Sequence, residues 1–169
     1  MTDQILVIPP TLRHFFVPRW VLQDSRLLLA GPGVQGDEAV ALWLGSVLSP
    51  TEARVEHVYF PRQIAYHSDD GVAIEIPIEE WTNLALQLPL GMFVLAKLHT
   101  HPGAAYHSET DAANPYLNHE GAVSITIPHF AQLPLDNLYR CSVNVLRQGR
   151  WIEISPSEVA EAFTITEDS

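Results

Sequence analysis

The sequence is poor in cysteine and in basic side chains. Cys141 is the one cysteine among 169 residues, which excludes an intrachain disulfide and any zinc site that needs several cysteine ligands. There are nine lysines and arginines against twenty aspartates and glutamates, so the formal charge is −11 at pH 7. Nothing in the chain resembles a basic stripe, and binding to the phosphate backbone of a nucleic acid is therefore disfavoured.

The sequence also has no long apolar run. Residues 1–10 contain no basic region and only four consecutive apolar residues, Ile5 to Ile8, which is unlike a signal peptide. The most apolar region, residues 84–98, is interrupted by Pro89 and Lys97 and is too short to span a bilayer. We therefore expect a cytoplasmic protein that does not associate with membranes.

What the sequence does contain is enough apolar surface for one core. Hydrophobic residues make up 47% of the chain, which is typical of a globular protein rather than a disordered one. No internal repeat or low-complexity segment divides the sequence. We predict one domain over residues 1–169, of the α/β class, with a mixed β-sheet flanked by helices.

The spacing of apolar residues predicts three helices. They are expected at residues 18–30, at residues 77–88, and from Ser155-Pro156 toward the C-terminus. Gly31 is predicted to lie just past the end of the first helix. The glycines of residues 31–36 then form a flexible turn, because no Lys-Ser or Lys-Thr follows them as a phosphate-binding loop would require.

Apolar and alternating runs predict the strands, and these fall at residues 5–8, 38–45, 54–60, 92–98, 123–127, 138–146 and 151–154. A turn at 67–71 leads into a short apolar run at 72–76. The segment 38–45 is apolar after its first residue, so we expect a strand that is buried on both faces beneath helices. Residues 54–60 are predicted to pair antiparallel with it, and the last two strands to form a hairpin.

A group of polar residues follows the apolar strand at 92–98. In extended chain, residues two apart point the same way, so His99 and His101 present both imidazoles on one side while Thr100 faces away. Pro102 favours extended backbone at His101. Asp111 can close over the same point after the loop. Two histidines, one carboxylate and a water form a zinc site of the open, catalytic type.

Other interpretations of these residues were weighed. An isolated His-x-His pair commonly arises by chance, and Ser108-x-x-Asp111 is also a plausible helix cap. The two roles are compatible, because a capped helix start would fix the aspartate where a metal needs it. A His-Glu-x-x-His site is excluded, since Val123 stands five positions on from His119. Cys141 is expected in the core rather than as a nucleophile.

Together with Glu38, these residues resemble the JAMM metalloproteases, also called the JAB or MPN-plus domain. Their pattern is an early glutamate at the start of a strand, then His-x-His-Pro, a loop and Ser-x-x-Asp. The resemblance covers roughly residues 15 to 150 and includes the order of the helices and strands. One departure is that six residues separate His101 from Ser108, one fewer than is usual in the family.

The resemblance implies a fold, a metal and a set of roles. The fold would be MPN/JAB-like, and Zn²⁺ would be held by His99, His101 and Asp111. Glu38 would act as general base and then general acid on the water that attacks the substrate. Ser108 would donate a hydrogen bond to the developing oxyanion.

The activity that the resemblance implies is zinc-dependent cleavage of a peptide or isopeptide bond after the C-terminal tail of a ubiquitin-like protein. Proteins similar to E1 and E2 enzymes would act in the same pathway. Two alternatives remain open at this point. One is a zinc amidohydrolase that acts on a sulfur-carrier adduct or a small molecule, and the other is a non-catalytic MPN scaffold. The complete set of Glu38, His99, His101 and Asp111 argues against the scaffold.

Overall fold

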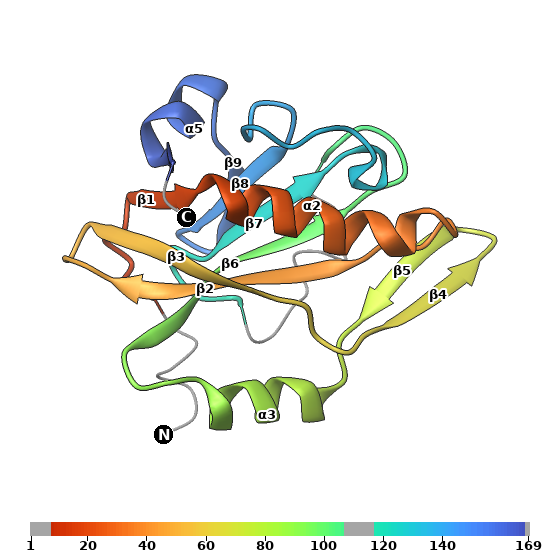
Figure 1. Ribbon diagram of the computed structural model, residues 1–169, viewed down its shortest axis with the longest axis horizontal. Coiled ribbons are helices and arrows are strands. Elements are labelled where there is room, and N and C mark those ends of the chain that lie inside the picture. The colour runs from red at the N-terminus through yellow and green to blue at the C-terminus, as the bar shows by residue number, and fades with distance from the viewer. Residues whose placement is uncertain (1–7, 107–116, 168–169) are drawn as a thin grey trace.

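An eight-stranded mixed β-sheet forms the centre of the computed structural model, which describes residues 8–106 and 117–167 (Figure 1). Its strands lie in the order β10-β1-β3-β2-β6-β7-β8-β9. Their bounds are β1 (His14–Pro18), β2 (Val40–Val47), β3 (Glu52–Tyr59), β6 (Met92–Thr100), β7 (Val123–Ile127), β8 (Ser142–Arg147), β9 (Arg150–Glu153) and β10 (Phe163–Thr166). A separate hairpin consists of β4 (Ile64–Ser68) and β5 (Gly71–Glu75).

Strand β2 lies in the middle of the sheet and is buried on both faces. It pairs antiparallel with β3 on one side and with β6 on the other, and β6 pairs parallel with β7. The first six residues of β2 are buried. Ala41 and Trp43 belong to one apolar cluster and Val40 and Leu42 to another. The expectation of an apolar strand covered on both faces is thus confirmed.

Helices pack on the two faces of the sheet (Figure 1). Helix α2 (Arg19–Gly33) joins the cluster that contains Trp43, and Ser25 on this helix accepts a hydrogen bond from Trp43 Nε1 at 2.9 Å. Helix α3 (Ile78–Gln87) packs its Trp81 and Leu84 against the opposite face. None of the helices in the described residues is long and apolar enough to cross a bilayer.

The C-terminal part of the fold follows its sequence signals closely. Strands β8 and β9 form the predicted antiparallel hairpin. Helix α5 (Pro156–Ala162) begins with Ser155 at its cap and proline at its first position. The Ser155 side chain accepts from Glu158 N at 3.3 Å, and Ser155 N donates to the Glu158 carboxylate at 2.7 Å. This reciprocal pair satisfies two backbone donors at the helix end.

Several boundaries differ from the sequence-based expectations. Helix α2 continues to Gly33, so the segment that was predicted as a flexible turn is partly helical. An added Cβ at Gly33 would lie 2.5 Å from the Cβ of Phe130, so the glycine permits close packing rather than flexibility. Strand β8 begins at Ser142, four residues later than predicted. Glu38 and Ala39 precede β2 instead of opening it.

Three short strands were not predicted from the sequence at all. They are β1, β4 and β10. The predicted strand at residues 5–8 lies outside the described residues except for Ile8, which is not in a strand. At Gly45 in β2, an added Cβ would come within 1.9 Å of the Arg54 carbonyl oxygen on β3, beside a pairing irregularity between Leu44 and Gly45. A glycine is therefore required where these two strands approach each other.

Candidate functional site

The two histidines lie where β6 leaves the sheet. His99 is the penultimate residue of this strand and His101 follows directly after it. Both side chains are buried, with 1% and 4% of their surface exposed. Their ring centroids are 5.0 Å apart and the rings are inclined by 65°. Two imidazoles are thereby held as neighbours inside the protein, on backbone that belongs to a packed strand.

The spacing of these rings fits a shared metal ion. Two imidazoles that bind one tetrahedral zinc at about 2.1 Å would have centroids about 5 Å apart. The observed centroid distance is 5.0 Å. Within residues 8–106 and 117–167, no group of three His, Cys, Asp or Glu side chains is placed to hold a metal. Ser108 and the third predicted ligand, Asp111, lie outside the described residues, so the ligand assignment stays a prediction.

Neighbouring side chains orient both imidazoles. The hydroxyl of Thr126 on β7 lies 3.2 Å from His99 Nε2 and is itself buried. The ring of Tyr106 meets His101 edge-on, with a centroid distance of 4.5 Å. Histidines that bind metals depend on such neighbours, because a hydrogen bond to one ring nitrogen fixes the direction of the other. Thr126 is thus the partner that sets the orientation of His99.

Backbone pairing brings Glu38 to the same end of the sheet. Val40 on β2 pairs with His99 on β6. One step further, Thr100 N donates to Ala39 O at 3.1 Å, and Ala39 N donates to Thr100 Oγ1 at 3.0 Å. The antiparallel register continued by one more residue places Glu38 opposite His101. Thr100, which faces away from the histidines as predicted, is therefore the residue that anchors the Glu38 segment to them.

A second anchor comes from the segment before the β4–β5 hairpin. The Gln63 side chain accepts from Val40 N at 2.7 Å and donates to Val40 O at 2.9 Å. In this way an amide side chain supplies the hydrogen bonds that a neighbouring strand would supply. On the other side of Glu38, Asp37 Oδ1 lies 2.5 Å from His67 Nε2. Two contacts thus attach the hairpin to the residues that flank Glu38.

Glu38 itself lies beside a cleft. The side chain is partly buried and lines a cavity of about 590 Å³. The same cavity is lined by Phe60, Pro61 and Gln63 from the chain before the hairpin, and by Ile74 from β5. Asp37 and Arg62 also line it. A carboxylate in a cleft with both apolar and charged walls, next to a pair of buried histidines, has the composition of an active site.

The Thr100 anchor makes a testable prediction about stability. The threonine is fully buried, so Thr100→Val would leave the Ala39 N–H without its acceptor while keeping the side-chain shape. We expect a loss of about 1–3 kcal/mol in the free energy of unfolding, measured by urea denaturation. Thr100→Ser keeps the hydroxyl and is the matched control, from which most of this loss should be absent. An unchanged free energy of unfolding in Thr100→Val would show that the hydrogen bond from Ala39 N does not stabilise the fold.

A strained turn holds the loop that follows His101. His129, Phe130 and Ala131 all have positive φ, at 55°, 52° and 57°, which costs about 1–2 kcal/mol for each such residue. The turn directs two backbone donors at the motif loop: Phe130 N donates to His101 O at 2.8 Å, and His129 N to Gly103 O at 3.0 Å. Backbone strain of this kind clusters at functional sites. Here it positions the carbonyl groups of His101 and Gly103 beside the histidine pair.

Cys141 takes no part in this arrangement. It lies just before β8, partly buried, and packs against the edge of the core. Loss of hydration through burial raises the pKa of its thiol to about 12. A thiol with such a pKa is protonated at neutral pH and is a poor nucleophile. This agrees with the expectation from the sequence that Cys141 is not catalytic.

Sequence reasoning missed four residues of the site, namely Gln63, Tyr106, Thr126 and Thr100 in its anchoring role. Alternation along the strand did place Thr100 on the side away from the histidines, so its contact with the neighbouring strand could have been predicted. No local pattern marks Gln63, because its partner Val40 is 23 residues away. Tyr106 and Thr126 likewise act on histidines through the tertiary fold.

Comparison with known proteins finds a relative that is similar to this chain over nearly its whole length. No family profile matches the sequence. A protein of Sinorhizobium fredii (strain NBRC 101917 / NGR234), named probable metalloprotease y4jG, is 31% identical over 156 residues, which are 92% of this chain and 96% of the relative.

Several solved structures are similar to this chain. A solution structure from Desulfitobacterium hafniense matches with a TM-score of 0.54 at 19% identity, over 91% of this chain and 94% of that one. One from Salinibacter ruber matches with a TM-score of 0.53 at 14% identity, over 82% and 88%. A JAB1/MPN domain protein from Archaeoglobus fulgidus has a TM-score of 0.45 at 19% identity, over 82% and 95%. On the strength of its relative in Sinorhizobium fredii, this chain belongs to a family of probable metalloproteases, as its resemblance to the JAB/MPN pattern predicts.

Proposed function

We propose that the protein is a zinc-dependent peptidase or isopeptidase that cleaves after the C-terminal tail of a ubiquitin-like protein, in deconjugation or in processing of a precursor. The observation that carries the proposal is the pairing of Ala39 with Thr100, which joins the Glu38 segment to the histidine pair. A general base and two metal ligands are thereby fixed to each other through the backbone. Such fixed geometry is what hydrolysis of an amide requires.

The residues of the chain divide the chemistry among them. Zinc bound by His99, His101 and Asp111 would supply Lewis acidity that activates a water molecule. Glu38 accepts a proton from the attacking water and then delivers it to the nitrogen of the leaving amine. Ser108 donates a hydrogen bond to the oxygen that gains negative charge. The roles of Ser108 and Asp111 rest on the motif, since both lie outside the described residues.

The form of the cleft supports an extended peptide as substrate. Apolar walls from Phe60, Pro61 and Ile74 run beside Glu38, and the β4–β5 hairpin stands next to them (Figure 1). The tail of a ubiquitin-like protein is extended and narrow, so it can enter such a cleft alongside exposed strand edges. We propose that E1-like and E2-like proteins of the same pathway make the conjugates that this enzyme cleaves.

A comparison of two substrates tests whether the enzyme recognises a folded modifier. One is a full ubiquitin-like protein fused through its C-terminus to a reporter, and the other is the isolated tail peptide on the same reporter. We expect kcat/KM to be at least about 10-fold higher for the full fusion, because burial of a further protein surface contributes binding energy. Equal values would exclude recognition of the folded protein. Cleavage of small amide adducts alone would instead identify an amidohydrolase.

A further inference from the structure

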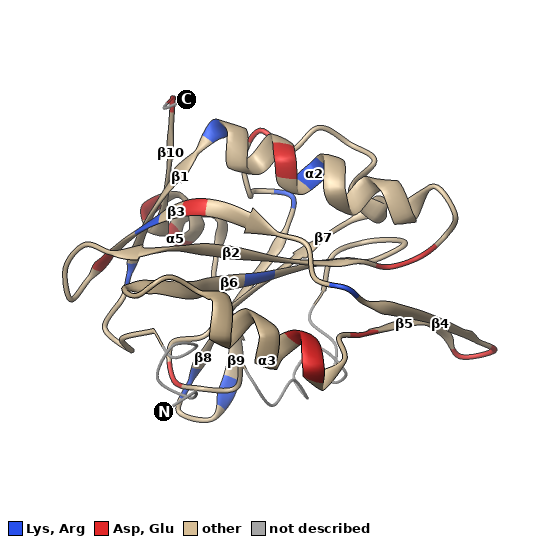
Figure 2. Ribbon diagram, turned by 60° about the horizontal axis from the view of Figure 1, so that its bottom comes forward, with Lys and Arg blue, Asp and Glu red and all other residues tan. Residues whose placement is uncertain are grey.

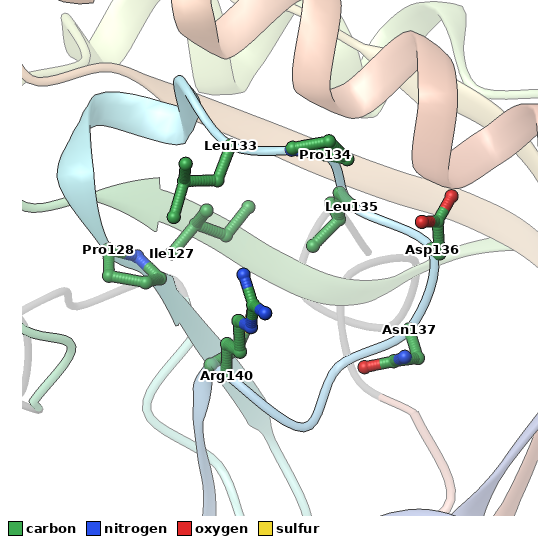
Figure 3. Close-up of a pocket in the computed structure, with 9 residues that line it drawn as sticks. Ile127, Pro128, Leu133, Pro134, Leu135, Asp136, Asn137 and Arg140 are labelled. Carbon is green, nitrogen blue, oxygen red and sulfur yellow. The ribbon is translucent and has the colours of Figure 1, made fainter.

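A second cleft lies on the other side of the histidine pair from Glu38. Its volume is about 240 Å³, and Figure 3 shows the residues that form it. The lining consists of Ile127, Pro128, Leu133, Pro134, Leu135, Asp136, Asn137, Arg140 and Cys141. Most of this wall is apolar. The side chain of Arg140 reaches up between Ile127 and Leu135, with its guanidinium in the middle of the cleft (Figure 3).

Arg140 has no ionic partner within the described part of the chain. Among residues 8–106 and 117–167 it makes no ion pair and no side-chain hydrogen bond. Asp136 lines the same cleft, but its carboxylate points away from the guanidinium (Figure 3). The five donors of Arg140 are thus open to a ligand.

The cleft continues toward the histidine pair. A second cavity of about 580 Å³ shares Pro128, Leu133, Arg140 and Cys141 with it and is also lined by Ala104 and Ala105 from the loop after His101. His101 N donates to Ile127 O at 3.0 Å, so the apolar wall begins one strand away from the histidines. A groove therefore runs from the loop behind His101 to the guanidinium of Arg140.

The distance along this groove sets the length of a ligand. Arg140 lies two residues before β8, and β8 is separated from β6 by β7 alone. Two strand spacings amount to about 10 Å. An extended peptide covers that distance with about three residues. A group held by Arg140 would thus be about three residues away from a bond that is cleaved beside His101.

The walls of the groove are fixed in place by contacts with helix α2. Arg26 donates to the carbonyl oxygens of Gln132 and Leu133 at 3.0 and 3.1 Å, and Gln132 Nε2 donates to Ala30 O at 3.0 Å. These bonds hold the segment between the strained turn and Leu135 against the helix. A binding site with fixed walls loses little entropy when a ligand enters it.

The charges around the histidine pair differ between its two sides. The β4–β5 hairpin carries Asp69 and Asp70 at its tip, and the first turn of α3 carries Glu79 and Glu80 (Figure 2). On the opposite side, the groove presents the open guanidinium of Arg140, while Asp136 and Glu153 also line its walls. A carboxylate on a substrate can pair directly with this guanidinium, which none of the acidic residues on the first side can offer. An acidic segment of the substrate is therefore best bound on the side of Arg140.

We propose that Arg140 is a specificity-determining residue that binds an acidic side chain about three residues beyond the scissile bond, on the leaving-group side of the substrate. The inference rests on the proposed function, because it takes the leaving group to be a peptide. Its chemistry is a guanidinium–carboxylate pair inside an apolar-walled groove, which is the bidentate recognition for which arginine is suited.

Binding of short peptides tests the site without any need for cleavage. The peptides are Ala-Ala-Glu-Ala, Ala-Ala-Gln-Ala and Glu-Ala-Ala-Ala, all with amidated C-termini so that glutamate supplies the one carboxylate. Their affinity for the zinc-loaded full chain is measured through the backbone amide NMR signals of Ala104 and Leu133, which line the groove and are present in every variant. We expect glutamate at the third position to bind about 10-fold more tightly than glutamine there. Glutamate at the first position should increase the affinity of the peptide much less.

Variants distinguish the effect of Arg140 on peptide binding from the effect of the overall charge of the protein. Arg140→Gln should remove the preference for glutamate, and Arg140→Glu should prefer a peptide with lysine at the third position. Arg150→Gln is the matched control, because Arg150 is also exposed but lines neither part of the groove. This control should keep the full preference. The same peptide sequences are then fused after the C-terminus of a ubiquitin-like protein. The rates of cleavage of these fusions show whether the preference for glutamate also holds in the reaction.

Each outcome decides one of the two proposals. Equal binding of the glutamate and glutamine peptides, a preference that survives Arg140→Gln, or no saturable shift at millimolar peptide would overturn the role of Arg140. Cleavage of all fusions at one rate would overturn it as well and leave the proposed function standing. A glutamate preference in binding without cleavage of any fusion would leave the Arg140 site standing and remove the peptidase.

Discussion

Replacement of Glu38 by glutamine is expected to lower kcat for a ubiquitin-like fusion by about 10²–10⁴-fold, the range that a general acid–base residue contributes. Glutamine keeps the size and the hydrogen-bonding shape of the side chain but cannot accept the proton of the attacking water. Glu38 is not a predicted ligand, so the zinc content should stay at that of the wild type. The measurement is kcat at saturating substrate together with elemental analysis of the same sample.

Glu79→Gln is the matched control for this experiment. Glu79 is an exposed carboxylate in the first turn of α3 and lines none of the clefts described above. Its loss removes the same charge from the protein, and kcat should stay within a factor of about 2 of the wild type. Undiminished activity of Glu38→Gln would remove Glu38 from the mechanism, whatever its position next to the histidines.

The second large effect is expected from the histidine pair. His101→Gln removes one of two buried imidazoles whose centroids lie 5.0 Å apart. We expect zinc affinity to fall by more than about 100-fold. Removal of a residue that only hydrogen-bonds to a metal ligand already lowers metal affinity by about 10–100-fold, and His101 is a predicted ligand itself. Hydrolysis should fall to the background rate in parallel. Isothermal titration with zinc, followed by the fusion assay, measures both quantities.

His57→Gln provides the comparison for His101→Gln. His57 is an exposed residue of β3 and lies far from the end of β6 in the strand register. This variant should bind zinc with wild-type affinity and keep full activity. If His101→Gln retained one tightly bound zinc per chain, the metal would have to be bound elsewhere, and the two-histidine centre would be wrong.

The parts of the fold that the sequence predicts are those with strong local patterns. The apolar segment of β2, the amphipathic helix α3 and the start of α5 at Ser155-Pro156 each carry their own signal, and all are present. Strands β1 and β10 could not be predicted, because they stabilise each other across most of the chain length. Phe15 and Phe163 stack with centroids 5.3 Å apart, and His14 Nε2 lies 2.7 Å from Thr164 Oγ1.

The error at the end of α2 has its physical cause far along the chain. The local sequence predicts a flexible turn at Gly33, but this residue adjoins Phe130, nearly one hundred residues later in the chain. Phe130 in turn has a positive φ, which no propensity for that residue would predict. The glycine and the strained turn are adapted to each other, and neither is understandable from its local sequence.

The candidate site likewise contains residues that the sequence predicts and residues that depend on the tertiary fold. Alternation along β6 was sufficient to predict that His99 and His101 share a side, because that inference uses the geometry of a strand alone. Glu38 could be singled out through the family pattern but not through local chemistry. The anchors that fix it, Gln63 above all, depend on tertiary contacts. The open guanidinium of Arg140 can be recognised only in the folded structure, where it lies in a cleft with mostly apolar walls.

The central claim is a zinc centre built on His99 and His101, and X-ray absorption at the zinc edge of the wild-type protein tests it most directly. We predict that the zinc ion is bound by two imidazole nitrogens at about 2.0–2.1 Å and by oxygen ligands at about 2.0–2.2 Å. A sulfur ligand at about 2.3 Å would place the metal at Cys141 and contradict the account. So would a spectrum with one imidazole or none, because the histidine pair could not then be the metal centre.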